Sequence, residues 1–256
     1  MSMKAFDLTA RVALVTGGNG GIGLGMAKGL AEAGATVAIL GRNRDKNEAA
    51  LASLAALGRP ASAHQGDVTS EADLKRVVAE IEQRHLRLDI LINNAGINIR
   101  KRPEEYALAE WRQILDTNLT SAFIAAQAAY PAMKRAGGGK IINIGSMMSI
   151  FGASFAGPYA ASKGGIVQLT RALASAWAAD NIQVNAVLPG WIDTDLTRRA
   201  RSDVPGLHER VLARTPAGRW GRPEDHAGIA VFLASAASDF VTGTAIPVDG
   251  GYSVQG

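Results

Sequence analysis

The sequence contains no cysteine, so the chain can form neither a disulfide framework nor a thiolate metal site. Its four histidines are too widely spaced for a metal-binding motif, and we expect no metal. Aromatic residues make up only 5%, which leaves few platforms for stacking nucleic-acid bases although the net charge is +4. Because basic and acidic side chains are interleaved along most of the chain, we expect no nucleic-acid partner.

Long hydrophobic runs are also missing. No apolar run reaches the roughly 20 residues that span a membrane, and the first residues lack the apolar core of a signal peptide. We therefore expect a cytoplasmic protein with no membrane partner. Hydrophobic residues nevertheless make up 47% of the 256 positions, which is enough for a large core. Because there is no repeat or linker, we expect a single domain over residues 1–256.

Short apolar runs alternate with helix-compatible segments through the whole chain. The runs lie near residues 12–15, 36–40, 61–65, 89–92, 141–144, 182–188 and 245–248. This alternation is typical of α/β proteins with parallel strands. It predicts a Rossmann-like, doubly wound parallel sheet of about seven strands with helices on both faces.

Three segments between these runs bear on function. Residues 108–135 should form a long helical stretch interrupted by polar Asp116, Thr117 and Asn118, and residues 158–179 should form another helix. The segment 191–206 is the least regular part of the chain. Because loops at the carboxyl edge of a parallel sheet commonly close over substrate, we expect a substrate loop near residues 190–220.

A glycine-rich turn follows the first apolar run and precedes a helix. Its glycines are Gly17, Gly21 and Gly23. Glycines let the backbone approach a pyrophosphate closely, and the N-terminus of the following helix offers unpaired N–H groups and a positive dipole. The turn therefore predicts a dinucleotide-binding site.

The residue that follows the second apolar run indicates which dinucleotide binds. An acid at this point usually binds the ribose 2′-hydroxyl, but here the chain reads Gly41, Arg42, Asn43. A guanidinium is suited to bidentate pairing with a 2′-phosphate. Arg42 therefore predicts NADP as the preferred cofactor, with NAD as the alternative.

Proton-transfer chemistry is indicated by Tyr159 and Lys163, which lie four residues apart in a predicted helix and hence on one face. A neighbouring cation should lower the pKa of the phenol and favour proton exchange near neutral pH. Ser146 ends the apolar run that begins at Ile141, and the ends of parallel strands carry the chemistry of open α/β sheets.

With these pieces together, the chain resembles the classical short-chain dehydrogenase/reductase family over residues 8–251. The resemblance is carried by the glycine turn, Asn93-Asn94-Ala95-Gly96, Asn118, Ser146, Tyr159-x-x-x-Lys163 and Pro189-Gly190. It implies an NAD(P)-dependent enzyme whose catalytic set is Asn118, Ser146, Tyr159 and Lys163. In that family Tyr exchanges a proton with the substrate oxygen, Ser holds this oxygen, Lys binds the nicotinamide ribose and lowers the Tyr pKa, and Asn sustains a water relay.

The resemblance also implies contacts with the cofactor. Besides Arg42, Tyr159 and Lys163, the implied cofactor-binding residues are Gly17, Asn19, Gly21, Ile22, Gly23, Asp67, Val68, Asn93, Ala95, Gly96, Pro189, Gly190, Ile192 and Thr194. A homotetramer built on the two long helices and the C-terminal strand is the family expectation.

Two segments narrow the resemblance within the family. Residues 139–147 and 216–221 are similar to those of members that oxidise sugar acids, namely 2-deoxy-gluconate or 2-dehydro-3-deoxy-gluconate dehydrogenases and gluconate 5-dehydrogenases. We expect a basic residue, Arg100 or Arg102, to pair with a substrate carboxylate, and Met147 and Trp191 to border the substrate. Two alternatives stay open. One is reduction of another carbonyl (a 3-oxoacyl carrier, a steroid or a cyclic ketone), and the other is a non-catalytic NADP-binding regulator.

Overall fold

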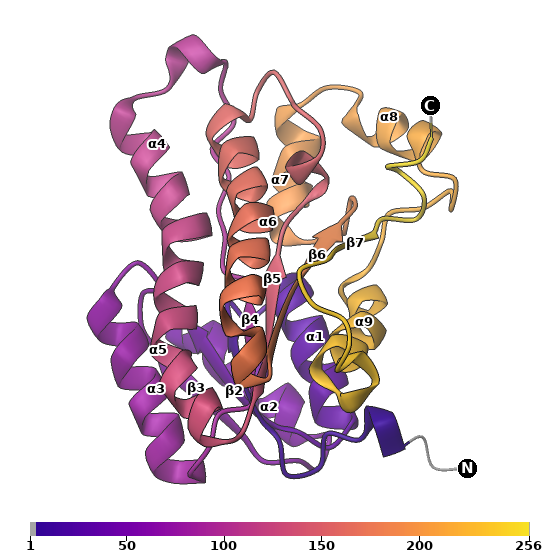
Figure 1. Ribbon diagram of the computed structural model, residues 1–256. Coiled ribbons are helices and arrows are strands. Elements are labelled where there is room, and N and C mark those ends of the chain that lie inside the picture. The colour runs from indigo at the N-terminus through magenta and orange to yellow at the C-terminus, as the bar shows by residue number, and fades with distance from the viewer. Residues whose placement is uncertain (1–3, 256) are drawn as a thin grey trace.

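One parallel sheet of seven strands organises the computed structural model, which describes residues 4–255 (Figure 1). The spatial order is β3-β2-β1-β4-β5-β6-β7, and each adjacent pair is parallel. The strands are β1 Val12–Thr16, β2 Thr36–Gly41, β3 Ala61–Gln65, β4 Ile90–Asn93, β5 Gly139–Ile144, β6 Ile182–Pro189 and β7 Ala245–Val248. The predicted doubly wound α/β fold is confirmed.

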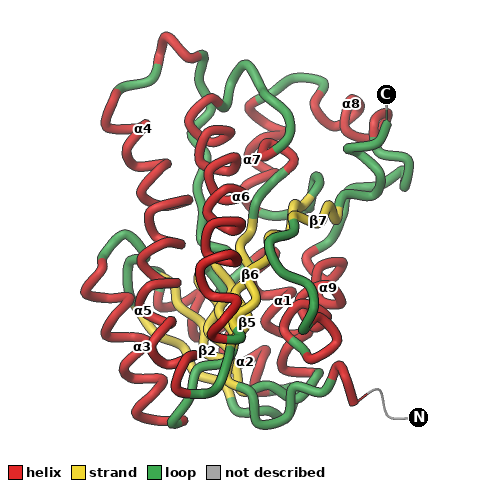
Figure 2. Tube along the Cα trace, in the orientation of Figure 1, coloured by secondary structure: helices red, strands yellow, loops and turns green. Residues whose placement is uncertain are grey.

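Helices cover both faces of the sheet (Figure 2). They are α1 Gly21–Glu32, α2 Arg44–Ala55, α3 Glu71–His85, α4 Leu108–Leu115, α5 Ser121–Arg135, α6 Gly157–Trp177, α7 Asp195–Asp203, α8 Leu207–Arg214 and α9 Ala227–Ala234. One apolar cluster packs α3, α5 and α6 against the sheet, and a second packs α1, α2 and α9 against the opposite face. Because the central strands are buried on both faces, they read as continuous apolar runs.

The strand order reverses between β1 and β4, which are neighbours in space but far apart in sequence. Ligands of open α/β sheets bind in the crevice outside such a switch point. The glycine turn leaves the carboxyl end of β1, and Asn93-Asn94-Ala95-Gly96 leaves the carboxyl end of β4. The topology therefore brings the two segments together at one edge of the sheet.

Two predicted segments differ in detail. The stretch 108–135 is α4 and α5 joined by a π-helical turn, Asp116–Thr120, at the polar residues expected to interrupt it. The expectation of an irregular segment at 191–206 is wrong, because α7 occupies most of it and α8 follows directly. Together α7 and α8 form a helical lid beyond the carboxyl end of β6. Over residues 4–255, no helix has the length and apolar character needed to span a membrane.

Candidate active site

The glycine turn has the backbone geometry of a phosphate cradle. Gly17 and Gly21 adopt positive φ angles of 62° and 50°, a conformation that side chains disfavour. A Cβ on Gly23 would lie 2.5 Å from the carbonyl oxygen of Gly17, so only glycine fits there. α1 begins after Gly20 with no side-chain cap, which leaves its first N–H groups available to an anion. The turn therefore fits the pyrophosphate of a dinucleotide.

Asn94 locks this turn to the end of β4. Its Nδ2 donates to the carbonyl oxygens of Thr16 (3.1 Å) and Gly17 (3.0 Å). In return, the Thr16 hydroxyl accepts hydrogen bonds from the backbone N–H groups of Asn94 and Ala95. Asn94 and Thr16 were absent from the predicted cofactor contacts, although both stand inside the motifs that suggested them. Their role is to hold the two binding segments in register.

Asn93 and Gly96 lie on either side of the residues that form these hydrogen bonds. The Asn93 side chain points into the core, where its Nδ2 donates to Asn143 Oδ1 at 2.9 Å. A Cβ on Gly96 would lie 3.3 Å from Asn118 Oδ1 and 3.6 Å from Lys163 Nζ. Gly96 therefore passes directly over two of the predicted catalytic residues.

The residues predicted for the adenosine end gather at the ends of β2 and β3. Arg42 is mostly exposed and lies 3.7 Å from the Asp67 carboxylate. The Asn19 amide, from the glycine turn, donates to Asn47 Oδ1 on α2 at 2.7 Å, and Val68 is buried against the core. Arg42 thus presents a guanidinium at the solvent edge of the crevice, where a 2′-phosphate would lie.

Tyr159 and Lys163 stand one turn apart on α6, as predicted. Lys163 is 4% exposed, its Nζ donates to the carbonyl oxygen of Ile144 at 2.6 Å, and it lies 5.7 Å from the centre of the Tyr159 ring. Burial lowers the pKa of Lys163 to about 8. Because Ile144 ends β5, this hydrogen bond ties the helix to the strand that delivers Ser146.

The pKa of Tyr159 does not shift in the predicted direction. Burial raises it above its ordinary value, while hydrogen bonding to Ser146 and the charge of Arg100 act in the opposite direction. Lys163 is not among these causes. In the ligand-free protein desolvation outweighs the neighbouring charges, so the pKa of Tyr159 is raised, whereas the sequence predicted that it would be lowered.

Ser146 lies two residues beyond the end of β5 and caps the short turn Met147–Ser149. Its Oγ accepts a hydrogen bond from the Met148 N–H at 3.1 Å. Ser149 supports it, since the Ser149 hydroxyl donates to the Lys163 carbonyl oxygen at 2.7 Å and accepts from the Ser146 N–H. Sequence reasoning missed Ser149, whose only signal is its place one turn after Ser146.

Asn118 occupies the π-helical turn and is 2% exposed. Its Oδ1 accepts from the Ile97 N–H at 2.8 Å, and its Nδ2 donates to the Ile97 carbonyl oxygen at 2.9 Å and to Ser162 Oγ at 3.1 Å. The amide is therefore both a satisfied core group and the centre of a helix irregularity. It links the segment that follows Gly96 to α6, which carries Tyr159.

The segment that follows β6 closes the crevice. Gly190 packs on Asp249, where an added Cβ would lie 2.6 Å from the Asp249 Cα, and Ile192 is buried. Thr194 precedes α7 and reaches the glycine turn, since a Cβ on Gly21 would lie 3.2 Å from Thr194 Cγ2. The predicted Pro189-Gly190 segment and the glycine turn therefore face each other.

Two ion pairs hold α7 over the crevice. Lys46, in the first turn of α2, lies 3.0 Å from Asp195 at the start of α7. Arg100 donates to the Leu196 carbonyl oxygen at 3.3 Å and lies 3.5 Å from Asp203 at the end of α7. Helix α7 is thus held at both of its ends.

The predicted substrate residues are separated by the fold. Arg100 is largely buried near Tyr159, whereas the Arg102 side chain is 73% exposed and pairs with Glu104. Met147 is buried beside Ser146. Trp191 packs edge-on against Trp220 and Tyr252.

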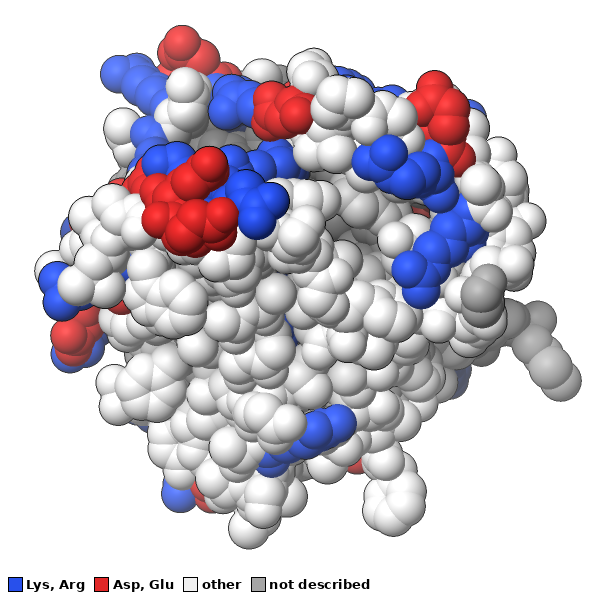
Figure 3. Space-filling view, turned by 90° about the horizontal axis from the view of Figure 1, so that it is seen from above, with Lys and Arg blue, Asp and Glu red and all other residues white. Residues whose placement is uncertain are grey.

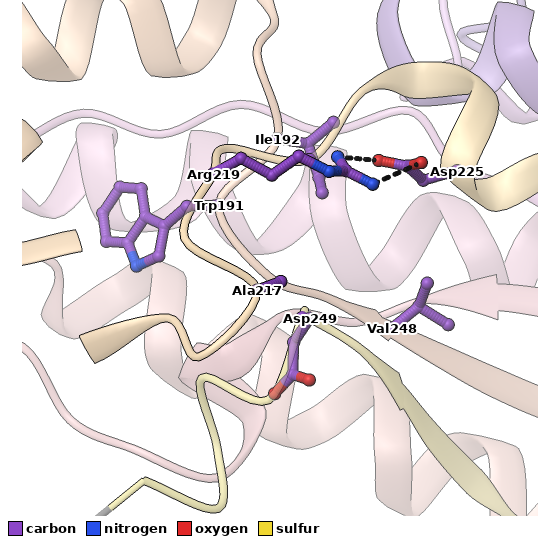
Figure 4. A pocket seen from close by; sticks show the side chains of 9 residues that line it. Trp191, Ile192, Ala217, Arg219, Asp225, Val248 and Asp249 are labelled. Atoms are coloured by element: carbon purple, nitrogen blue, oxygen red, sulfur yellow. Dashed lines mark hydrogen bonds and ion pairs between the residues drawn. The ribbon is translucent and has the colours of Figure 1, made fainter. Parts of the chain in front are cut away.

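A cavity of about 190 Å³ lies beside Trp191 (Figure 4). Arg219 and Asp225 form a bidentate pair on one side of it, and the Trp191 indole points away from this pair. Its lining is Trp191, Ile192, Ala217, Arg219, Gly221, Asp225, Val248, Asp249 and Gly250. None of these is a predicted catalytic residue.

Known proteins share this fold and are similar to the chain in sequence. The family model described as enoyl-(acyl carrier protein) reductase matches residues 17–253. A solved short-chain type dehydrogenase/reductase from Mycobacterium marinum superposes with a TM-score of 0.93 at 37% identity, covering 98% of each chain. The chain belongs to the short-chain dehydrogenase/reductase family and is an NAD(P)-dependent oxidoreductase that interconverts an alcohol and a carbonyl group.

Two similar proteins within the family carry more specific names. The chain is 42% identical to a 2-dehydro-3-deoxy-D-gluconate 5-dehydrogenase of Formosa agariphila, over 98% of this chain and 96% of that protein. It is 40% identical to a gluconate 5-dehydrogenase from Burkholderia cenocepacia, solved in complex with NADP and tartrate, with a TM-score of 0.94 and 99% of each chain covered.

Proposed function

We propose that this protein is an NADP-dependent dehydrogenase that interconverts a secondary alcohol and a ketone of a sugar acid. The observation that carries the proposal is the intact set of Ser146, Tyr159, Lys163 and Asn118 around one crevice, in a chain similar over almost its full length to sugar-acid dehydrogenases. Residues 1–256 would act as one dinucleotide-binding and catalytic domain, with residues 190–220 covering the substrate.

The chain's own residues would manage the proton. When bound, NADP supplies the acceptor or donor of the hydride. In the oxidative direction Tyr159 in its phenolate form would take the proton from the substrate hydroxyl while the hydride leaves the carbon that bears this hydroxyl, and Ser146 would donate a hydrogen bond to the substrate oxygen. Lys163 lies beneath the phenol ring, with a pKa of about 8 that suits proton exchange near neutral pH. Asn118 positions Ile97 and α6 around them.

NADP is proposed because Arg42 offers a mostly exposed guanidinium at the end of β2, where the chain carries no acidic residue that would bind the ribose 2′-hydroxyl. The relative from Burkholderia cenocepacia was solved with NADP. The glycine turn would hold the pyrophosphate, Asp67 and Val68 would border the adenine, and Ile192 and Thr194 would hold the carboxamide.

Arg100, Met147 and Trp191 are proposed to border the substrate. Arg100 acts at the reacting end, since its charge lowers the pKa of Tyr159. Arg102 stays a prediction from sequence, because its side chain is largely exposed and engaged with Glu104.

A substrate panel tests this function. Purified protein with NADP should oxidise gluconate or reduce 2-dehydro-3-deoxy-gluconate, followed by nicotinamide absorbance, with a kcat/KM at least about tenfold above that for uncharged polyols and for steroid or cyclic ketones. A higher kcat/KM on the hydrophobic ketones would assign the enzyme to a different substrate class.

A cytoplasmic homotetramer is proposed as the working form. Large apolar side chains stand exposed on α4 and α5, namely Leu108, Trp111 and Phe123, and Phe123 is 45% exposed. Apolar side chains on long helices are suited to contact with a second copy of the chain. Sedimentation at micromolar concentration should give the tetramer mass, and a monomer would contradict the proposal.

A further inference from the structure

Arg214, the last residue of α8, is held between two aromatic rings. Its guanidinium carbon lies 4.7 Å from the centre of the Phe151 ring and 4.5 Å from the centre of the Tyr252 ring. The two rings meet at an interplanar angle of 73°. Stacking of this kind fixes the guanidinium plane and leaves its N–H edge free for a planar anion.

Three other arginines in this part of the molecule are paired with carboxylates. Arg100 pairs with Asp203, Arg201 with Asp193, and Arg219 with Asp225. Within residues 4–255, by contrast, Arg214 has no carboxylate oxygen within 4.0 Å and donates no hydrogen bond to another residue. It is an oriented cation with its hydrogen-bonding capacity unused.

Arg214 also lines an open hollow of about 520 Å³, together with Arg210, Ala213 and Gln255. No acidic residue is among these lining residues. In the view from above, Lys and Arg side chains stand around a hollowed area on the side of the C-terminal elements (Figure 3). An anion entering this hollow would meet positive charge first.

Phe151, whose ring contacts Arg214, lies near Ser146 in the chain. The Phe151 N–H donates to the Met147 carbonyl oxygen at 2.9 Å, so the chain folds back within one turn of Ser146. At a rise of about 2 Å per residue in such a turn, Phe151 lies at most about 10 Å from Ser146 along the chain. Arg100 stands instead at the reacting end, where its charge acts on Tyr159. A substrate carboxylate several bonds from the reacting carbon needs a second cation farther out.

We propose that Arg214 binds the carboxylate of the sugar-acid substrate and selects acids over uncharged polyols. The inference rests on the proposed function and assigns the carboxylate subsite within it. The Phe151 and Tyr252 rings orient the guanidinium. Both oxygens of the substrate carboxylate accept hydrogen bonds from N–H groups of Arg214.

The test compares Arg214→Gln and Arg214→Lys with wild type, and with Arg199→Gln as a matched control. Arg199 is an exposed arginine of the same lid, on α7. For Arg214→Gln, the KM for the sugar acid should rise roughly 10- to 100-fold with kcat little changed, because a charge-assisted pair is lost. The KM for an uncharged polyol should not move. For Arg214→Lys the KM for the sugar acid should lie between those of wild type and Arg214→Gln, since lysine keeps the charge but lacks the two parallel N–H donors of a guanidinium. The KM of Arg199→Gln should match that of wild type.

An unchanged acid KM in Arg214→Gln, or an equal rise for acid and polyol, would show that Arg214 only supports the fold. Direct binding separates this failure from failure of the proposed function. Intrinsic fluorescence titration of NADP-loaded protein with gluconate and with glucitol reports affinity without turnover. If wild type binds gluconate more tightly but never oxidises it, the proposed function fails while Arg214→Gln still tests the subsite. If wild type binds both alike, the subsite is refuted.

Discussion

Lys163 lies beneath the Tyr159 ring, 5.7 Å from its centre, and donates a hydrogen bond to the Ile144 carbonyl oxygen instead of to the phenol oxygen. The two side chains share one buried site, and burial disfavours the charged form of each, raising the pKa of Tyr159 and lowering that of Lys163 to about 8. In the ligand-free site burial therefore favours the neutral phenol of Tyr159 and makes Lys163 release its proton more readily than an exposed lysine does.

Replacement of Tyr159 by Phe should remove turnover and spare cofactor binding. The loss of a general acid–base group predicts a fall in kcat of roughly 10²- to 10⁴-fold. The ring and its contact with Lys163 remain, so the Kd for NADP, measured by fluorescence titration, should change less than about twofold. Turnover equal to wild type would refute the role given to Tyr159.

Replacement of Lys163 by Met should abolish turnover yet stabilise the fold. The folded-state pKa of about 8 lies below the ordinary 10.5, so the folded protein binds this proton more weakly than the unfolded chain does. Below pH 8 the buried ammonium costs stability on the order of 3 kcal/mol, and the cost fades as the pH rises toward 10.5.

Urea unfolding of Lys163→Met and wild type at pH 7 and pH 10 measures that difference. The variant should be the more stable at pH 7, and the gap should narrow at pH 10. Lys75→Met, at an exposed lysine paired with Glu71, serves as the control and should shift stability by less than about 0.5 kcal/mol. A gap that widens with pH would contradict the prediction.

Replacement of Arg42 by Ala should weaken NADP and leave NAD unaffected. Loss of a guanidinium–phosphate contact predicts a rise in the NADP Kd of roughly 10- to 100-fold. Arg44→Ala is the matched control, because Arg44 is two residues away and engaged with Glu48. Calorimetric titration with each cofactor decides the point, and a parallel loss of NADP and NAD affinity would count against a 2′-phosphate contact.

Replacement of Gly23 by Ala should damage the cradle, whereas Gly20→Ala should not. A Cβ on Gly23 would lie 2.4 Å from Asn94 Nδ2 and 2.5 Å from the Gly17 carbonyl oxygen, while one on Gly20 meets nothing within 4 Å. Gly20 also has an extended φ of 177°, which any residue adopts. We expect Gly23→Ala to cost about 1–3 kcal/mol of stability and most of the cofactor affinity. Thermal unfolding and NADP titration of both variants would show whether the difference holds.

The sheet and the catalytic set could be predicted because their signals are local. A strand buried on both faces must be continuously apolar, as Ile90–Asn93 and Ile182–Pro189 largely are. The left-handed conformations at Gly17 and Gly21 favour glycine, so the turn can be recognised in the sequence from its glycines.

The features that the sequence did not predict depend on contacts between residues that are distant in the chain. The charged segment Asp195–Asp203 reads as a loop in the sequence, yet it forms a helix. Lys46 and Arg100 form ion pairs with its two ends, and hydrophobic periodicity cannot predict contacts between residues so far apart in the chain. The sequence places a cation four residues from Tyr159 but does not show how deeply both are buried, and burial decides the pKa. Arg214 has no motif, because its significance comes from Phe151 and Tyr252, which lie far from it along the chain.

The π-helical turn Asp116–Thr120 separates α4 from α5 by one residue more than an ordinary helix would need. One residue corresponds to about 100° of rotation around a helix axis. Deleting a single residue from this turn would give an uninterrupted helix, swing Asn118 away from Ile97, and turn the face of α5 that packs on the sheet. The additional residue of the π-helical turn therefore sets both the position of the Asn118 amide and the rotation of α5. An insertion or deletion at this turn changes the two together.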